Sequence, residues 1–96
     1  MRHYIAIIHK EPDSAYGVSF PDVPGVVASA GSLDAALAEA REALAFAAED
    51  WSKLSGTSFP APRSLDTLRR DSHFRETSAE AVVAAIPLRE DIGAAA

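Results

Sequence analysis

The chain has 96 residues, of which 48% are hydrophobic, and its 9 basic and 14 acidic side chains give a formal net charge of −5. That length allows one domain with a single core, and an acidic chain without a basic run is poorly suited to direct nucleic-acid binding. The sequence contains no cysteine, which excludes disulfides, thiol nucleophiles and cysteine-based zinc sites. No apolar run is long enough to span a membrane, and strand-like sequence follows the first residues directly. We therefore expect a cytoplasmic domain over residues 1–96, with a core at about 3–88 and a frayed tail at 89–96.

Three strands are predicted in the first third of the chain. Residues 3–9 are rich in β-branched and aromatic side chains, and residues 16–20 alternate large with small ones, so the two runs form a hairpin. Residues 26–30 form a third strand, which Gly31 ends. The segment before it is irregular, because Pro21 and Pro24 cannot donate hydrogen bonds and Gly25 is free to adopt a positive φ.

The rest of the chain is mainly helical. Ser32 occupies the N-cap position of a helix over residues 33–54, which has Leu and Ala at helical spacing and Gly56 behind its last turn. Ser64 caps a short helix over residues 65–70, and residues 80–86 form a final strand that Pro87 ends. The order β-β-β-α-(α)-β predicts a two-layer α+β domain with an antiparallel meander. We expect the last strand beside the first and parallel to it, since a helix crossover permits that arrangement.

Both faces of the predicted sheet are apolar. The first strand places Ile5 and Ile7 on one face and Tyr4, Ala6 and Ile8 on the other. A single long helix covers only one face, so a second copy, in a homodimer or tetramer, or a partner protein is expected over the other. The alternative is that the short helix and the polar segment at 71–79 fold over it.

No set of side chains indicates catalysis, and no metal or cofactor site is predicted. His3 and His9 share a strand face, but roughly 20 Å of strand separates them, so they cannot hold one metal ion. A cryptic two-metal nuclease would need carboxylates held close together. The candidates are Asp22, Asp34, Glu39, Glu49 and Asp50. None of them lies within a predicted strand, and those in the helix fall mostly on a solvated face.

The outward face of the long helix is the candidate binding surface. It carries, on the side opposite the predicted core positions, Glu39, Glu42, Phe46, Glu49, Asp50 and Lys53, and the candidate partner-binding residues are all of these except Lys53. Phe46 is either an apolar anchor within an acidic patch suited to a basic protein, or it packs under the loop at Phe59 and Pro60.

One segment resembles a known family. The run from Tyr16 to Gly25 contains Phe20-Pro21-Asp22-Val23-Pro24-Gly25; Gly31-Ser32 and an alanine-rich helix follow, and then Pro60-Ala61-Pro62-Arg63-Ser64. This pattern is similar to the HicB family of antitoxins, over about residues 4–86. The resemblance implies a truncated RNase-H-like fold without nuclease residues, and a partner that is a small, basic, RNA-cleaving toxin of the HicA type. Many members of that family add a carboxy-terminal DNA-binding module, whereas this chain ends about ten residues after its last predicted strand, so we expect a short form without such a module.

Within this motif, Asp22 is expected to accept backbone N–H groups in a loop that is short of donors, Phe20 to be buried against the helix, and Gly25 to permit the chain reversal. A direct toxin contact through Asp22 is the alternative. The remaining alternative for the whole protein is a solo oligomeric binding domain that has no toxin partner.

Overall fold

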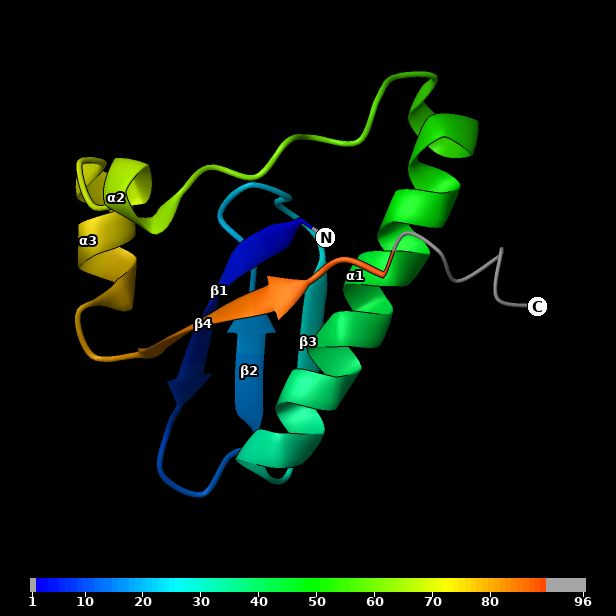
Figure 1. The fold of residues 1–96 in the computed structure, drawn as a ribbon. Helices are drawn as coiled ribbons and strands as arrows, with labels where there is room; N and C mark the ends of the chain where they lie inside the picture. Colours follow the sequence, from blue (N-terminus) through cyan, green and yellow to red (C-terminus); the bar gives the residue numbers. More distant parts are fainter. Residues whose placement is uncertain (1, 90–96) are drawn as a thin grey trace.

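In the computed structural model, which describes residues 2–89, a four-stranded sheet lies between one long helix and two short ones (Figure 1). The elements are β1 (His3–Lys10), β2 (Tyr16–Ser19), β3 (Val27–Ala30), α1 (Leu33–Ser55), α2 (Leu65–Leu68), α3 (Ser72–Ser78) and β4 (Val82–Pro87). The predicted meander, long helix and final strand are confirmed. Residues 71–79, for which the sequence predicts no element, contain α3. The tail expected at 89–96 lies outside the described residues, except for Arg89.

The sheet has the order β3-β2-β1-β4, and every neighbouring pair is antiparallel. The expectation that β4 runs parallel to β1 is therefore wrong. A single helix crossover would return the chain to the start of β1. Instead, the chain continues through α2 and α3 to the far end of β1. There the His9 ring donates from Nε2 to the carbonyl oxygen of Thr77 at 2.7 Å. β4 starts there, with Val82 opposite Ile8, and must run back antiparallel.

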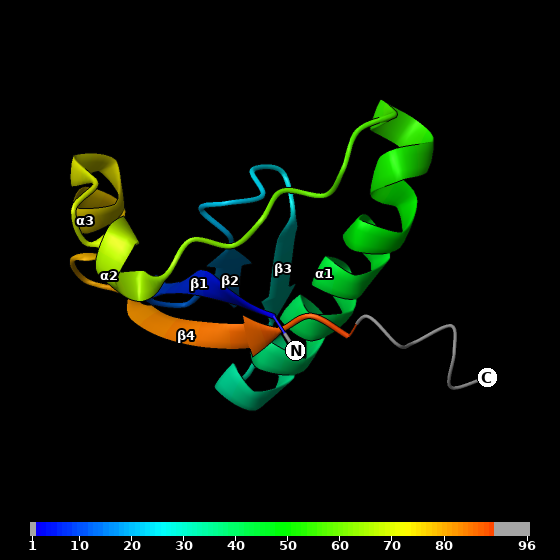
Figure 2. The ribbon, with the colours of Figure 1, turned by 45° about the horizontal axis from the view of Figure 1, so that its top comes forward.

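The main core lies between the sheet and α1. Tyr4, Ala6 and Ile8 of β1 point toward this side and are at most 2% exposed. The helix contributes Ala36, Ala40 and Leu44, all fully buried. Alanine at two of these three positions lets the helix approach the strands closely, and α1 packs beside β3 (Figure 2).

The opposite face of the sheet is covered in part by α2 and α3. Ile5 and Ile7 form a second buried cluster with Leu68 and Phe74, which are 0% and 4% exposed. The alternative, in which the chain's own short helix and polar segment fold over this face, is therefore confirmed for β1. The β4 part of the same face stays open, because Val83 is 36% exposed and Ala85 is also exposed.

Candidate functional site

The candidate site is built on α1, whose start is fixed by its cap. The Ser32 hydroxyl accepts the backbone N–H of Ala35 at 3.2 Å, and its carbonyl accepts the N–H of Ala36 at 2.9 Å. At the other end, Gly56 has φ +72°, a value that ends a helix without strain in glycine. These two ends set the length of the helix, and burial of its Ala and Leu face sets its rotation. The predicted binding residues consequently lie on the outward face.

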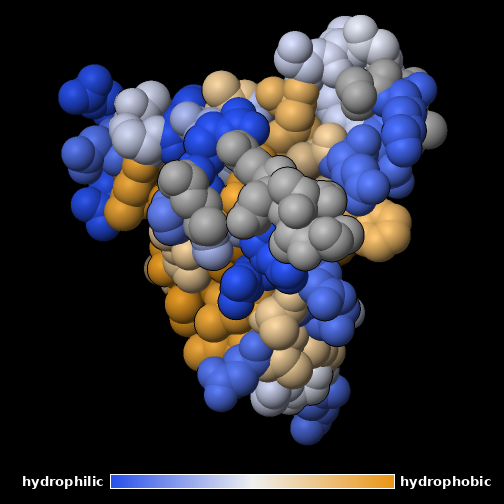
Figure 3. Space-filling view, turned by 45° about the vertical axis from the view of Figure 1, so that its right-hand side comes forward, coloured by the Kyte–Doolittle hydropathy of each residue, from blue (hydrophilic) through white to orange (hydrophobic). Residues whose placement is uncertain are grey.

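We call this outward surface the acidic helix face; it consists of Glu39, Glu42, Phe46, Glu49 and Asp50. Its first four members are exposed, and Asp50 is half-buried. In Figure 3, hydrophilic and hydrophobic groups alternate on the side of the molecule that carries α1. The structure thus brings these five side chains together on one surface.

Phe46 stands out on this face, because 69% of its surface is exposed to solvent. The alternative in which Phe46 packs under the loop at Phe59 and Pro60 is wrong. Phe59 instead packs against Tyr4 and Trp51, with ring centroids 5.5 Å apart in both pairs. The Tyr4 hydroxyl also donates to the carbonyl oxygen of Pro60. The loop is therefore occupied by other aromatic side chains, and no aromatic ring among the described residues 2–89 packs against Phe46.

Phe46 separates two hollows in the surface. The larger one, of about 420 Å³, is mostly apolar and runs between α1 and the loop before β3. Its lining residues are Pro24, Gly25, Val26, Phe46, Ala47, Asp50, Trp51 and Ser55. The smaller one, of about 210 Å³, lies between Glu42, Phe46 and Glu49 and includes Arg89. A protruding aromatic ring beside an apolar groove and a ring of carboxylates has the anatomy of a protein-binding hot spot.

The proline-rich loop at 21–25 shapes one wall of the larger groove. Val23 is fully buried, and Gly25 has φ +96°, so the chain reverses there as expected. Phe20 is 2% exposed and packs in the cluster that α1 closes, again as expected. The groove and the sequence motif are therefore one structural unit.

Asp22 holds this loop to the segment after α1. Its carboxylate, with 7% of the side chain exposed, accepts the backbone N–H of Arg63 at 2.7 Å and forms an ion pair with Nε of the same residue. The hydrogen bond that the Arg63 guanidinium donates to Asp22 raises the pKa of Arg63 above its ordinary value. The sequence predicts that Asp22 accepts N–H groups of its own loop, but the backbone N–H group that it accepts belongs to the segment after α1. The donor comes from a residue 41 positions away in the sequence, a partner that local pattern reasoning did not identify.

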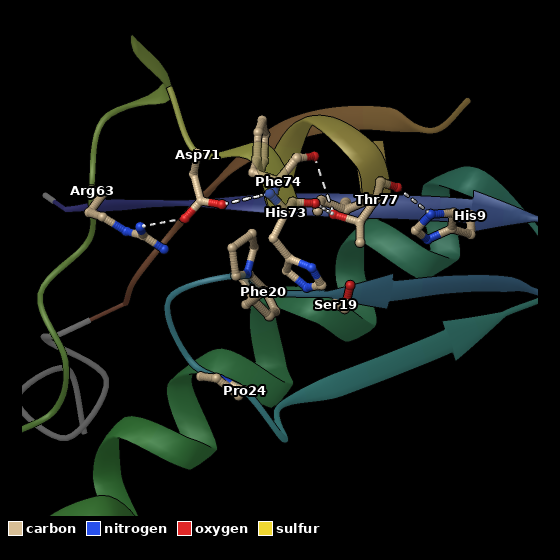
Figure 4. A pocket seen from close by; sticks show the side chains of 11 residues that line it. His9, Ser19, Phe20, Pro24, Arg63, Asp71, His73, Phe74 and Thr77 are labelled. Carbon is tan, nitrogen blue, oxygen red and sulfur yellow. Dashed lines mark hydrogen bonds and ion pairs between the residues drawn. The ribbon is translucent and has the colours of Figure 1, made fainter. Parts of the chain in front are cut away.

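A third hollow, of about 320 Å³, lies between α3 and the β1–β2 hairpin. Figure 4 shows His73 pointing from α3 toward Ser19 and Phe20, while Arg63 reaches Asp71 across the mouth at 3.6 Å. Asp71 caps α3, and the backbone N–H groups of Phe74 and His73, together with Arg63, lower the pKa of this carboxyl group below its ordinary value. These contacts all stabilise the position of α3. The polar residues around this pocket therefore have a structural role.

Within residues 2–89, no three side chains among His, Asp and Glu gather in an arrangement that could hold a metal ion. The three histidines are spread over β1 and α3. In the same part of the chain, no helix combines the length and hydropathy that crossing a bilayer requires.

The family of the chain follows from comparison with known proteins. A family model described as the HicB-like antitoxin of bacterial toxin-antitoxin systems matches residues 4–90. This chain belongs to the HicB-like antitoxin family. A search of curated protein sequences gave no match.

Solved HicB structures share the fold. The crystal structure of the Burkholderia pseudomallei antitoxin HicB superposes with a TM-score of 0.79 at 26% identity, covering 95% of this chain and 66% of that one. The amino-terminal domain of the same antitoxin gives a TM-score of 0.72 at 27% identity, over 90% and 96% of the two chains. A HicA3–HicB3 toxin-antitoxin complex gives 0.68 at 18% identity, over 90% and 96%. The chain thus spans about two thirds of the length of the first of these antitoxin chains. The α+β fold predicted from the order of the elements is confirmed, and the RNase-H-like character implied by the resemblance stays a prediction.

Proposed function

We propose that this HicB-like protein is the antitoxin of a toxin-antitoxin pair and inhibits a small, basic, RNA-cleaving toxin of the HicA type by covering it. The observation that carries the proposal is the exposed Phe46 in the middle of the acidic helix face. An aromatic side chain that the chain's own loop leaves free costs solubility, and it is retained most readily where a partner buries it. The family assignment supports an antitoxin role.

The charge distribution supports a cationic partner. Glu39, Glu42 and Glu49 are exposed on one side of α1 and surround Phe46, and the whole chain carries a formal charge of −5. A protein that binds RNA presents a positive surface, so the two surfaces attract each other before contact. Covering that positive surface would keep RNA from the toxin. Such an inhibitor needs no catalytic residue of its own, and its place of action would be the cytoplasm, where the RNA is.

The apolar groove beside Phe46 supplies the second half of the mechanism. Long-range attraction accelerates association, whereas burial of apolar groups slows dissociation. Phe46 and the groove between Trp51 and Pro24 would provide this burial. Asp22 acts at a distance from the contact in this scheme, by holding the groove wall in place through Arg63.

The test co-expresses this chain with the protein encoded by the neighbouring gene, which the proposal expects to be a toxin of the HicA type. We expect the two to purify as one complex in which the toxin no longer cleaves RNA. The association rate should fall steeply as salt is raised, because exposed charges are screened. Failure to form a complex would refute the proposal, and an association rate that does not change with salt would remove its electrostatic part.

A further inference from the structure

The outer edge of β4 is an apolar surface that the described chain leaves open. β4 is an end strand of the sheet, and Figure 2 shows no helix or strand of residues 2–89 beyond it. Val82 is 50% and Val83 is 36% exposed. All residues from Ala81 to Pro87 are uncharged. Soluble proteins usually protect such an edge with charged side chains, because an open edge pairs with other chains.

The hydrogen bonds of β4 show which backbone groups are free for pairing. The N–H of Leu88 donates to the carbonyl oxygen of Arg2 at 2.8 Å, so the backbone of Leu88 points toward β1. In an antiparallel ladder this direction alternates along the strand. Ile86, Ala84 and Val82 therefore also point toward β1, whereas Ala85 and Val83 direct their N–H and C=O groups away from it.

We propose that β4 pairs with β4 of a second copy of this chain, antiparallel and about a two-fold axis at Ala84. This axis places Val83 of each copy opposite Ala85 of the other. Each such pair exchanges two bonds, so about four backbone hydrogen bonds form across the interface. The same strand supplies both halves of the interface, which is what a closed two-fold dimer requires.

The side chains fit this register. On the α1 face, Val82 lies opposite Ile86 of the second copy, and Ala84 faces Ala84. On the other face, Val83 meets Ala85, so the part of the sheet that α2 and α3 leave open is continued by the second copy. Pro87 has no N–H to offer, and the N–H of Ala81 already donates to the carbonyl oxygen of Ser78 at 3.1 Å. These two residues limit the pairing to the central positions and oppose a shift of register.

Charge favours a second copy in the antiparallel direction. The strand is preceded by Glu80 and followed by Arg89, both exposed. Antiparallel pairing brings Glu80 of one copy to the end of the strand where Arg89 of the other lies, whereas parallel pairing would bring like charges together. Two copies that repel each other elsewhere, at −5 each, can therefore meet at this uncharged edge.

The experiment measures the mass of the toxin-free protein in solution and the exchange of individual amides. We expect a two-fold dimer of the 10.1 kDa chain by sedimentation equilibrium. The amides of Val83 and Ala85 should exchange more slowly as protein concentration rises. Ala85→Pro removes an outward N–H that β1 does not use, and Val83→Lys places a cation in the interface. Each should raise the dimer dissociation constant about tenfold or more.

Ala38→Lys, on the exposed side of α1, adds the same charge away from β4 and should leave the dimer unchanged. Three results would overturn the proposal. One is a protein that stays monomeric up to millimolar concentration. The second is a dimer that tolerates Val83→Lys without weakening. The third is protection of the Val83 and Ala85 amides only after the toxin is added, which would place a toxin strand on this edge. Toxin binding is measured separately, so failure of the dimer leaves the proposed inhibition standing.

Discussion

Replacement of Phe46 by alanine separates binding from folding, because the side chain lies outside the core. With 69% of its surface in water, Phe46 contributes little to the packing of α1. Exposed helix positions tolerate substitution within about 0.5 kcal/mol of the free energy of unfolding. Alanine is also a stronger helix former than phenylalanine. We therefore expect the thermal midpoint of Phe46→Ala to stay close to that of the unchanged protein.

The expected loss of affinity follows from the exposed area. A phenylalanine presents on the order of 200 Å², and 69% of it is accessible here, so about 140 Å² is available for burial by a partner. At about 25 cal/mol per Å², full burial is worth roughly 3.5 kcal/mol. Anchor residues of this kind lose at least about 2 kcal/mol on truncation. The dissociation constant of the toxin complex should thus rise about 30-fold to 300-fold.

The assay is the dissociation constant of the toxin complex, measured by titration at one fixed salt concentration. Val27→Ala is the matched control. Val27 is 66% exposed, and as the first residue of β3 it lies on the face opposite α1, since its neighbour Ala28 packs in the α1 cluster. Truncation at Val27 should leave toxin affinity unchanged. If Phe46→Ala binds the toxin as tightly as the unchanged protein, or if Val27→Ala weakens binding equally, the acidic helix face is not the contact surface.

Three further predictions concern the parts that hold the site in place. Asp22→Ala should lower the free energy of unfolding by about 1–2 kcal/mol, because the N–H and guanidinium of Arg63 lose their acceptor; urea unfolding measures this, and an unchanged midpoint would contradict it. Leu68→Ala should cost about 2–5 kcal/mol, since the fully buried side chain closes the second cluster, whereas Leu68→Met should cost less than about 1.5 kcal/mol. The lowered pKa of Asp71 means that its contribution to stability is present above the ordinary carboxyl value of 3.8 and is lost as the pH falls through the lowered pKa. The thermal midpoint of Asp71→Asn should therefore fall less on acidification than that of the unchanged protein. Midpoints that fall in parallel would refute this role of Asp71.

Several elements were predictable from the sequence because their signals are local. Ser32 caps α1 through contacts within one turn, and Gly56 ends it through its own backbone freedom. The alternation of apolar residues in β1 assigned Tyr4 and Ile5 to opposite faces, and both faces were correct. The helix α3 was missed, since its amphipathic pattern is reduced to Phe74 among polar side chains. It is fixed by the Asp71 cap and by packing on β1.

The sequence by itself determined the spacing of apolar and polar residues, and with it the strands, the long helix and the acidic composition of its outward face. Only the tertiary structure decided the direction of β4, the exposure of Phe46 and the pairing of Asp22 with Arg63. Spacing is a property of neighbouring residues and survives in any fold. The direction of a strand, the packing of Tyr4 and Trp51 in place of Phe46 against Phe59, and an ion pair across 41 positions depend on how distant segments share one small volume.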